Sequence, residues 1–278
     1  MPAFDLLQVV TGASLALVAA GLGYIGRALS HSGAVAAFFL GTLIFGLGGL
    51  PWALLLLTFF VPSSLLSLMF KKRKALTDAN YEKGSRRDAW QVLANGGLAG
   101  FFAVIHWMAP GSLLPWLAAS ASLAAASADT WATELGALSR REPVLITTGR
   151  KVARGTSGAV SLEGEMAALL GAAWIAAASF ILFPNGGVGA NSMSHLWSAV
   201  GIAVAGLLGC TIDSALGATL QVKFFCPLCS KETEKHPTHG CGTATEYLHG
   251  IRWLNNDWVN FACTLSAVVA IYVMSLLI

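Results

Sequence analysis

Long apolar stretches separated by short polar segments dominate the chain. Several of them approach the roughly 20 apolar residues that a helix needs to cross the hydrocarbon core of a bilayer. The pattern predicts eight membrane-spanning helices, at residues 5–27, 33–50, 51–70, 88–108, 112–128, 161–183, 195–221 and 257–278. The sequence therefore predicts an all-α, polytopic transmembrane bundle. It forms a single integral membrane domain over residues 1–278, with a Cys- and His-containing loop inserted at 222–256.

The distribution of charge gives this bundle an orientation. All 17 Lys and Arg residues follow the first, third, fifth or seventh predicted span, so they share one face of the membrane. By the positive-inside rule that face is cytoplasmic, and both termini then lie on the non-cytoplasmic side. Of the 14 acidic residues, only Asp5 lies toward the outer side. We expect an integral protein of the bacterial inner membrane, or an equivalent membrane, with its active site facing the cytoplasm.

Composition narrows the class of protein. The chain is 55% hydrophobic and 11% charged, far from the values of soluble domains, which excludes a soluble enzyme. A channel or an alternating-access transporter usually needs polar groups through the full depth of the membrane. Because the charged residues gather on one side, a one-sided site is favoured, and transport of a lipid phosphate is kept as the alternative.

Polar residues enter the start of the fourth predicted span. Asp88, Gln91 and Asn95 are spaced so that they share one helix face. A solvated first turn explains Asp88, but it does not explain two amides pointing the same way into hydrocarbon. Gln91 and Asn95 are therefore candidate binding residues.

Two other spans carry carboxylates near their cytoplasmic ends. Asp129 falls at the predicted end of its helix, where a negative charge opposes the helix dipole, and Thr130 and Glu134 follow at a spacing of four. Asp213 lies about 12 Å inside its span, at 1.5 Å per residue. An isolated ionised carboxylate at that depth is costly, so Asp213 needs a cation or a metal beside it.

The loop before the sixth predicted span combines glycines, hydroxyls and positive charge. Gly155 and Gly158 free the backbone, Thr156 and Ser161 offer hydroxyls, and Arg154 offers a cation. The loop leads into a helix N-terminus, where unpaired amides attract anions. It is not a Walker A motif, because the string G-x-x-x-x-G-K-[ST] does not occur. A basic loop next to a membrane can also serve only to fix the topology.

The start of the last span adds Asn256, Asp257 and Asn260. Taken alone, Asp257 is explained as a helix cap and dipole partner. Together, however, Asp129, Glu134, Asp213 and Asp257 lie at one membrane level beside cationic loops. Mutually repelling acids near anion-binding amides predict Mg²⁺ ions that bridge to phosphate.

The inserted loop contains a separate group of metal ligands. Cys226, Cys229 and Cys241 stand close together in the sequence, with His236 and His239 between them. Three thiols and one imidazole can complete a tetrahedral zinc site, which we assign to the three cysteines and His239. Free or redox-active thiols remain the alternative.

Five segments in the same order carry a family resemblance. GSRRDAWQVLANGG, ADTWATELG, RGTSGAVSLEG, DSALGATLQ and NNDWVN together resemble the integral-membrane family of the plant chloroplast phytyl-phosphate kinase and animal transmembrane protein 19. The resemblance runs from about Gly84 to Asn260, and the N-terminal part is similar in hydropathy only. It implies phosphorylation of a phytyl or geranylgeranyl monophosphate to the diphosphate by a nucleoside triphosphate, with CTP preferred, in tocopherol or quinone salvage.

The resulting functional assignment covers the whole polar face. The partners expected are CTP or another nucleoside triphosphate, a prenyl phosphate and membrane lipids, with no nucleic acid. Transfer of a nucleotidyl group from CTP to a prenyl lipid is the chemical alternative. The acids would hold Mg²⁺, and the remaining candidates would hold phosphates or donate hydrogen bonds: Arg86, Arg87, Gln91, Asn95, Thr130, Arg154, Gly155, Thr156, Gly158, Ser161, Ser214, Gln221, Asn256 and Asn260.

Overall fold

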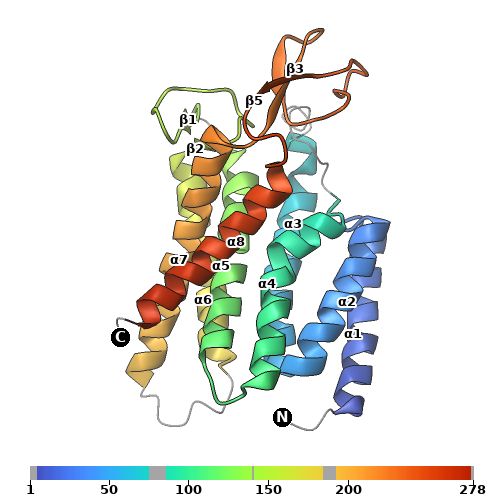
Figure 1. Ribbon diagram of the computed structural model, residues 1–278, viewed down its shortest axis with the longest axis vertical. Helices are drawn as coiled ribbons and strands as arrows, with labels where there is room; N and C mark the ends of the chain where they lie inside the picture. Colours follow the sequence, from blue (N-terminus) through green and yellow to red (C-terminus); the bar gives the residue numbers. More distant parts are fainter. Residues whose placement is uncertain (1–4, 75–85, 140, 184–191, 277–278) are drawn as a thin grey trace.

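The computed structural model describes residues 5–74, 86–139, 141–183 and 192–276. Within these ranges the chain forms eight long helices and two small sheets, which confirms the all-α transmembrane class (Figure 1). The helices are α1 (Leu6–Ile25), α2 (His31–Gly48), α3 (Leu50–Lys74), α4 (Ala89–Met108), α5 (Leu114–Gly136), α6 (Leu162–Ile181), α7 (Ser192–Thr219) and α8 (Asn256–Ser275). The strands are β1 (Val144–Leu145), β2 (Ala159–Val160), β3 (Lys223–Cys226), β4 (Lys231–Thr233) and β5 (Glu246–His249).

Helix α5 is the centre of the bundle. It packs against α3, α4, α6, α7 and α8, and every residue from 118 to 128 is buried. Most of these residues are alanine or serine, so neighbouring helices can approach closely. A Cβ added to Gly209 of α7 would lie 2.7 Å from Ala125 Cβ and 2.7 Å from the Cys263 carbonyl oxygen. The three helices therefore meet with no room for a further methyl group.

The outer helices carry the lipid-facing surface. Among the residues that the structure describes, six helices are long and apolar enough to cross a membrane: α1, α2, α3 over Leu50–Phe70, α6, α7 over Ser194–Thr219, and α8. Large apolar side chains such as Leu7, Phe39 and Ile181 are exposed on them, as a bilayer requires. Helix α5 is shielded by its neighbours, and Gln91, Asn95 and His106 lower the hydropathy of α4. That α4 and α5 also span the bilayer stays a prediction.

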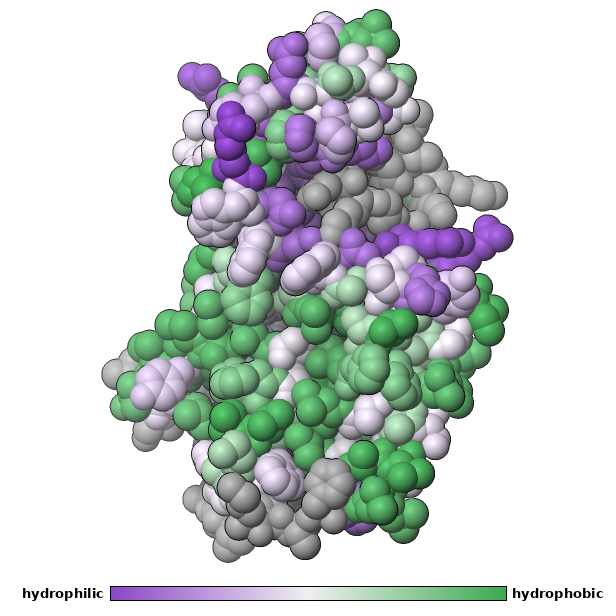
Figure 2. All heavy atoms as spheres, turned by 45° about the vertical axis from the view of Figure 1, so that its right-hand side comes forward, coloured by the Kyte–Doolittle hydropathy of each residue, from purple (hydrophilic) through white to green (hydrophobic). Residues whose placement is uncertain are grey.

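The two ends of the bundle differ in character. Both sheets lie at one end, and both termini lie away from it (Figure 1). Hydrophilic residues gather at the end with the sheets, whereas hydrophobic residues cover the helices below (Figure 2). The arrangement matches the one-sided polarity expected from the sequence, and the assignment of this end to the cytoplasm stays a prediction.

Two helix boundaries refine the prediction made from hydropathy: α5 ends later than predicted, and the break between α2 and α3 is confined to one residue. Helix α5 continues to Gly136, eight residues beyond the predicted end of its span. Asp129, Thr130 and Glu134 therefore lie inside a helix and not after it, because hydropathy falls where the helix leaves the apolar layer while its hydrogen bonds continue. Between α2 and α3 the chain breaks only at Gly49, whose φ of 76° is unfavourable for residues with a side chain.

The loop inserted between α7 and α8 has a fold of its own. Its three strands form an antiparallel sheet in the order β4-β3-β5, with Phe224 of β3 opposite Thr233 of β4. The shorter connection between α5 and α6 forms a two-stranded hairpin, in which Val144 of β1 faces Val160 of β2. Both sheets stand over the same helix ends, and these ends form the site.

The packing around α5 gives a test of the fold. We expect Gly209→Ala to lower the free energy of unfolding by about 1–3 kcal/mol, because its new methyl group would meet backbone that cannot move away. Gly21→Ala in α1 is the matched control, since a Cβ there meets nothing within 4 Å. Because alanine is the better helix former, the control should be unchanged or more stable. Thermal unfolding in detergent, followed by tryptophan fluorescence, measures both, and equal midpoints would contradict this packing.

Candidate functional site

A cavity of about 270 Å³ lies at the end of the bundle beneath the sheets. It is lined by the ends of six helices, α3 to α8, and by the β1–β2 connection. The structure brings together here most of the residues singled out in the sequence: Arg87, Gln91, Asn95, Asp129, Thr130, Glu134, Arg154, Gly155, Thr156, Gly158, Ser161, Asp213, Ser214, Gln221, Asn256 and Asn260. The first and last of these residues, Arg87 and Asn260, lie 173 positions apart in the sequence.

Three carboxylates enter the cavity from the two most central helices. Asp129 and Glu134 lie on α5, and Asp213 lies on α7. Glu134 is buried, and its Oε1 accepts a hydrogen bond of 2.7 Å from Ser67 Oγ of α3. The Oδ2 atom of Asp213 is buried with no hydrogen-bond partner in the part of the chain that the structure describes, and Asp129 is a neighbouring negative charge. This concentration of negative charge in a partly enclosed cavity favours compensating cations.

Arg87 supplies one such cation from the segment that precedes α4. Its backbone is fixed to the α1–α2 connection, because its N–H donates to Ala28 O at 2.9 Å and its carbonyl accepts from Ser30 N at 2.9 Å. The guanidinium lies 5.5 Å from the ring centroid of Phe59. Burial lowers the pKa of Arg87 to about 10, and the charges of Glu134 and Asp129 oppose that shift. Arg87 is therefore a permanent cation at neutral pH beside two carboxylates.

The glycine-rich turn after Arg154 forms the roof of the cavity. Gly155 and Gly158 have φ values of 82° and 76°, in the left-handed region that favours glycine. A Cβ added to Gly158 would lie 2.5 Å from Ala218 N and 2.6 Å from Ser214 O of α7. The turn is thus packed directly on the helix that carries Asp213. Backbone and hydroxyl groups of residues 155–158 line the cavity, as a phosphate-binding loop would.

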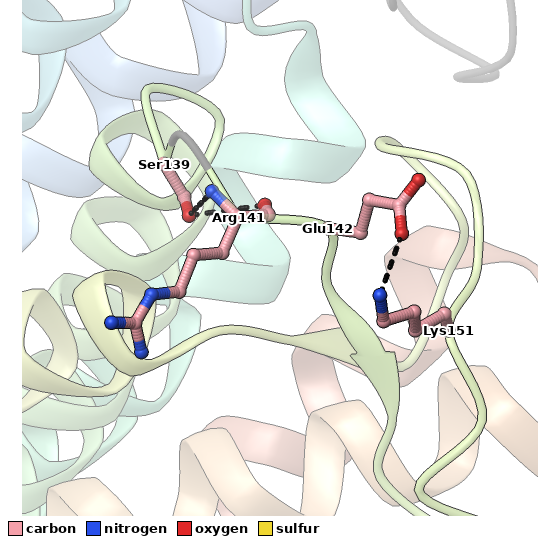
Figure 3. Close-up of polar contacts among 4 residues, drawn as sticks. All are labelled: Ser139, Arg141, Glu142 and Lys151. Atoms are coloured by element: carbon pink, nitrogen blue, oxygen red, sulfur yellow. Dashed lines mark hydrogen bonds and ion pairs between the residues drawn. The ribbon is translucent and has the colours of Figure 1, made fainter.

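The basic residues between α5 and α6 fall into two groups: one forms an exposed ion pair, and another lines the cavity. Lys151 Nζ forms an ion pair of 3.2 Å with Glu142, and both side chains are largely exposed (Figure 3). Nearby, Ser139 Oγ accepts a hydrogen bond of 3.1 Å from the backbone N–H of Arg141. Among the described cations of residues 141–161, Arg154 alone lines the cavity. It is therefore the loop residue placed to meet an anionic ligand.

Three helices, α4, α6 and α8, begin at the cavity. Asp88 caps α4 in a capping box with Gln91, Ser161 caps α6 by accepting from Gly164 N at 3.1 Å, and Asn255 caps α8. Gln91 and Ser161 thus have structural bonds as well as a place in the cavity wall. The positive ends of three helix dipoles point toward the same space, which favours an anionic ligand.

Two predicted site residues lie elsewhere. Asp257 lies in the first turn of α8 but does not line the cavity, and the cap predicted for it is made by Asn255 instead. An acid in the first turn stabilises the helix dipole, which accounts for its position. Arg86 is exposed and also lies outside the cavity, whereas its neighbour Arg87 lines it.

The structure adds polar residues that the sequence pattern did not single out. Ser67, Glu165 and Glu234 line the cavity, although the first two lie in long apolar helices and the third lies beside the cysteines. Ser157 Oγ donates a hydrogen bond to Glu234 Oε1, and Lys223 Nζ donates to Ser157 O at 3.4 Å. Burial lowers the pKa of Lys223, and the charge of Glu234 opposes this shift. The inserted segment therefore contacts the glycine-rich turn through the acidic side chain of Glu234 and the basic side chain of Lys223.

Four metal-ligating side chains meet within the inserted segment. The potential ligand atoms of Cys226, Cys229, His239 and Cys241 all lie within 4.8 Å of one another. These are the four residues assigned to zinc from the sequence. None of them lines the cavity, so they form a separate centre.

Comparison with known proteins places the chain among membrane proteins. A family model described as "Integral membrane protein DUF92" matches residues 14–268, so the match begins within α1, well before the resemblance seen from Gly84. Protein PGR of Arabidopsis thaliana is 33% identical over 257 residues, which is 87% of each chain. Uncharacterized membrane protein MJ0933 of Methanocaldococcus jannaschii is 33% identical over 56% of this chain and 64% of its own length.

A second plant protein is also similar. Protein VTE6, chloroplastic, of Arabidopsis thaliana is 28% identical over 87% of this chain, which spans 64% of that protein. No solved structure matches the chain. The arrangement of the cavity is therefore described from this chain alone.

The buried carboxylates give a test that is independent of any reaction. We expect Asp213→Asn to raise the thermal midpoint in metal-free buffer, because it removes one of several clustered, mutually repelling negative charges without changing the shape of the side chain. Asp88→Asn is the control: asparagine caps a helix as well as aspartate does, so its midpoint should change little. Unfolding in the presence of a chelator measures both variants. A lower midpoint for Asp213→Asn would mean that a fixed protein cation already neutralises this group.

Proposed function

The chain belongs to the DUF92 family of integral membrane proteins, and we propose that it is a Mg²⁺-dependent kinase that converts an isoprenyl monophosphate to the diphosphate. The phosphoryl donor would be a nucleoside triphosphate, with CTP as the first candidate, and the site would face the cytoplasm. One observation carries the proposal: three carboxylates of α5 and α7, two arginines and a glycine-rich turn line one cavity at the end of a membrane bundle. Phosphoryl transfer needs just these elements, since it depends on positioning and on neutralisation of charge.

The carboxylates fit a Mg²⁺ requirement. Mg²⁺ is usually held by one or two carboxylates together with phosphate oxygens and water. Asp213 offers a buried Oδ2 with no hydrogen bond from the described chain, and Asp129 lies close enough to act on it electrostatically. When bound, the metal would neutralise negative charge on the donor and acceptor phosphates during transfer of the phosphoryl group. Glu134 already accepts a hydrogen bond from Ser67 and interacts with the charge of Arg87. It is therefore better placed to hold Arg87 in position than to bind the metal.

The cationic side of the cavity would hold the phosphates. Arg87, fixed by its backbone and stacked near Phe59, offers a rigid donor, and Arg154 offers a second cation from the loop. The turn at residues 155–158 presents backbone groups on the same wall. Together these groups would keep the donor and acceptor phosphates in line and stabilise the charge that spreads over the transferred phosphoryl group.

The reaction that we propose for this cavity exchanges one phosphorus–oxygen bond for another. An oxygen of the prenyl monophosphate bonds to the γ-phosphorus, the bond from that phosphorus to the β-phosphate oxygen breaks, and the nucleoside diphosphate leaves. A phosphate monoester with its second pKa near 6 is largely a dianion at neutral pH, so its oxygen needs no base to remove a proton. The described lining of the cavity has neither histidine nor lysine, which suits a phosphate acceptor.

The lipid part of the substrate is inferred from the position and size of the cavity. Its volume of about 270 Å³ lies at the lower limit of ligand pockets, which are roughly 300–1,000 Å³. It can hold phosphate groups but not a long isoprenoid chain as well. The tail would remain between the helices or in the bilayer. Similarity to Protein VTE6, chloroplastic, and the resemblance to the phytyl-phosphate kinase family support a prenyl chain.

Two other activities are the alternatives. Transport of a lipid phosphate would require a polar path toward the other end of the bundle, whereas the described lining of this cavity comes from one end. Nucleotidyl transfer would use the same donor but attack its α-phosphorus and release pyrophosphate. The position of the transferred phosphorus separates it from the kinase reaction.

The decisive experiment follows the label from the nucleotide. Purified protein would be incubated with phytyl or geranylgeranyl phosphate, Mg²⁺, and CTP labelled in either the γ- or the α-phosphate. We expect labelled prenyl diphosphate and CDP from the γ-labelled donor. Transfer of the α-label with release of pyrophosphate would identify nucleotidyl transfer. An absence of turnover with every nucleotide and prenyl phosphate tested would contradict both reactions.

The role of the acids is tested by Asp129→Asn. We expect kcat/KM to fall about 10²-fold or more, because charge stabilisation by a single group at a transition state is commonly of that size. Glu142→Gln is the matched control, since it removes one negative charge from an exposed ion pair outside the cavity. The same steady-state assay, at several Mg²⁺ concentrations, should show near-normal activity for the control. Full activity of Asp129→Asn would remove Asp129 from the metal group.

The role of the loop is tested by Arg154→Gln against Lys151→Gln. Each change removes one positive charge from the same connection, but only Arg154 lines the cavity, while Lys151 pairs with Glu142. We expect Arg154→Gln to raise the KM for a phosphate substrate about tenfold, in line with the loss of one hydrogen bond to a charged group. Lys151→Gln should change it less than twofold. Equal effects would indicate that the loop acts only through its general positive potential.

A further inference from the structure

The segment between α7 and α8 is a small sheet with little core of its own. Its three strands comprise four, three and four residues, and every residue of β5 is exposed. A polypeptide of this size cannot bury enough apolar surface to fold by packing alone, and such segments are usually held by disulfides or a metal. In the structure its cysteines are free thiols. Some other interaction must therefore hold the two turns of this segment together.

The two turns meet at the four side chains Cys226, Cys229, His239 and Cys241. Cys226 ends β3 and is fully buried, Cys229 lies in the β3–β4 turn, and the other two lie in a second turn closed by the Gly242 N–H to the His239 carbonyl at 2.9 Å. Cys226 Sγ is 3.6 Å from Cys241 Sγ, and His239 Nδ1 is 3.2 Å from the same sulfur. In a tetrahedral site with Zn–S bonds of about 2.3 Å, the sulfur atoms would be about 3.8 Å apart.

We infer that Cys226, Cys229, His239 and Cys241 bind a structural zinc ion. Four protein ligands leave no open position, which distinguishes a structural from a catalytic zinc site. A disulfide between any two of the thiols would leave the third thiol and the imidazole without a reason to converge. This metal site does not depend on the reaction proposed for the cavity, because none of its ligands lines that cavity.

The same segment contacts the cavity through Ser157. Glu234, which directly follows β4, accepts a hydrogen bond from Ser157 Oγ, and Lys223, at the start of β3, donates to Ser157 O. Both residues are buried. The zinc-bound segment would thereby hold the turn at residues 155–158 in place over the cavity. This positioning role rests on the proposed function for its catalytic meaning, but it can be measured without catalysis.

Metal content gives the direct test. Protein purified in detergent without chelators should contain one zinc ion per chain by elemental mass spectrometry. Replacement with Co²⁺ should give the visible and thiolate charge-transfer bands of a tetrahedral site. We expect His239→Gln and Cys241→Ser to lose or weaken both signals. His236→Gln should keep them, since His236 lies in the same segment but outside the cluster and stacks on Phe224.

The outcomes separate the possibilities. A protein without zinc, a disulfide found by mass spectrometry of the unreduced chain, or unchanged zinc content in both His239→Gln and Cys241→Ser would overturn the metal site. Hydrogen exchange then tests positioning: Cys241→Ser should speed amide exchange in residues 155–158 severalfold, whereas His236→Gln should not. If exchange there is unchanged when zinc is lost, the segment does not hold the turn. Neither result depends on the kinase assay, so the two proposals can fail separately.

Discussion

The close approach of helices around α5 determines where every charged group of the site can lie. Small residues along α5 allow both α6 and α7 to pack closely against it, as at Gly171 against Ser127 and Gly206 against Ala124. With larger side chains the ends of these helices that line the cavity would be held further apart, and Asp129 and Asp213 could no longer face the same cavity. The chemistry of the site thus depends on an interior that contributes shape and almost no polarity.

That packing creates an electrostatic problem which the surrounding segments resolve. Carboxylates from α5 and α7 come together in a cavity between packed helices, where their repulsion is screened less than it would be in bulk water. Arg87 offsets part of it from outside the two helices, and Ser67 donates a hydrogen bond to Glu134. The rest of the negative charge remains available for a cation brought with the ligand. A site built in this way is less stable than it could be, as is common where binding energy is stored for function.

The sequence predicts the framework of the fold better than its contacts. Hydropathy gives the number of helices, and the one-sided charges indicate which helix ends form the site. The hydropathy pattern places the end of α5 eight residues too early, because hydropathy reports the environment of a residue and not the continuity of helical hydrogen bonds. Ser67 and Glu234 could not be found in this way, since each acts through a partner more than sixty residues away in the sequence. Asp257 is the opposite case: it is a charge at the expected level that does not line the cavity and whose position its own helix explains.

The order of the helices along the chain has a consequence for biosynthesis. Asn256 and Asn260 line the cavity from the start of α8, which follows the other seven described helices in the sequence. Until α8 is inserted, α5 lacks one of the neighbours that shield it from lipid, and its alanine- and serine-rich surface is only weakly apolar. Assembly of the complete cavity is therefore coupled to insertion of α8, after the seven described helices that precede it have been made.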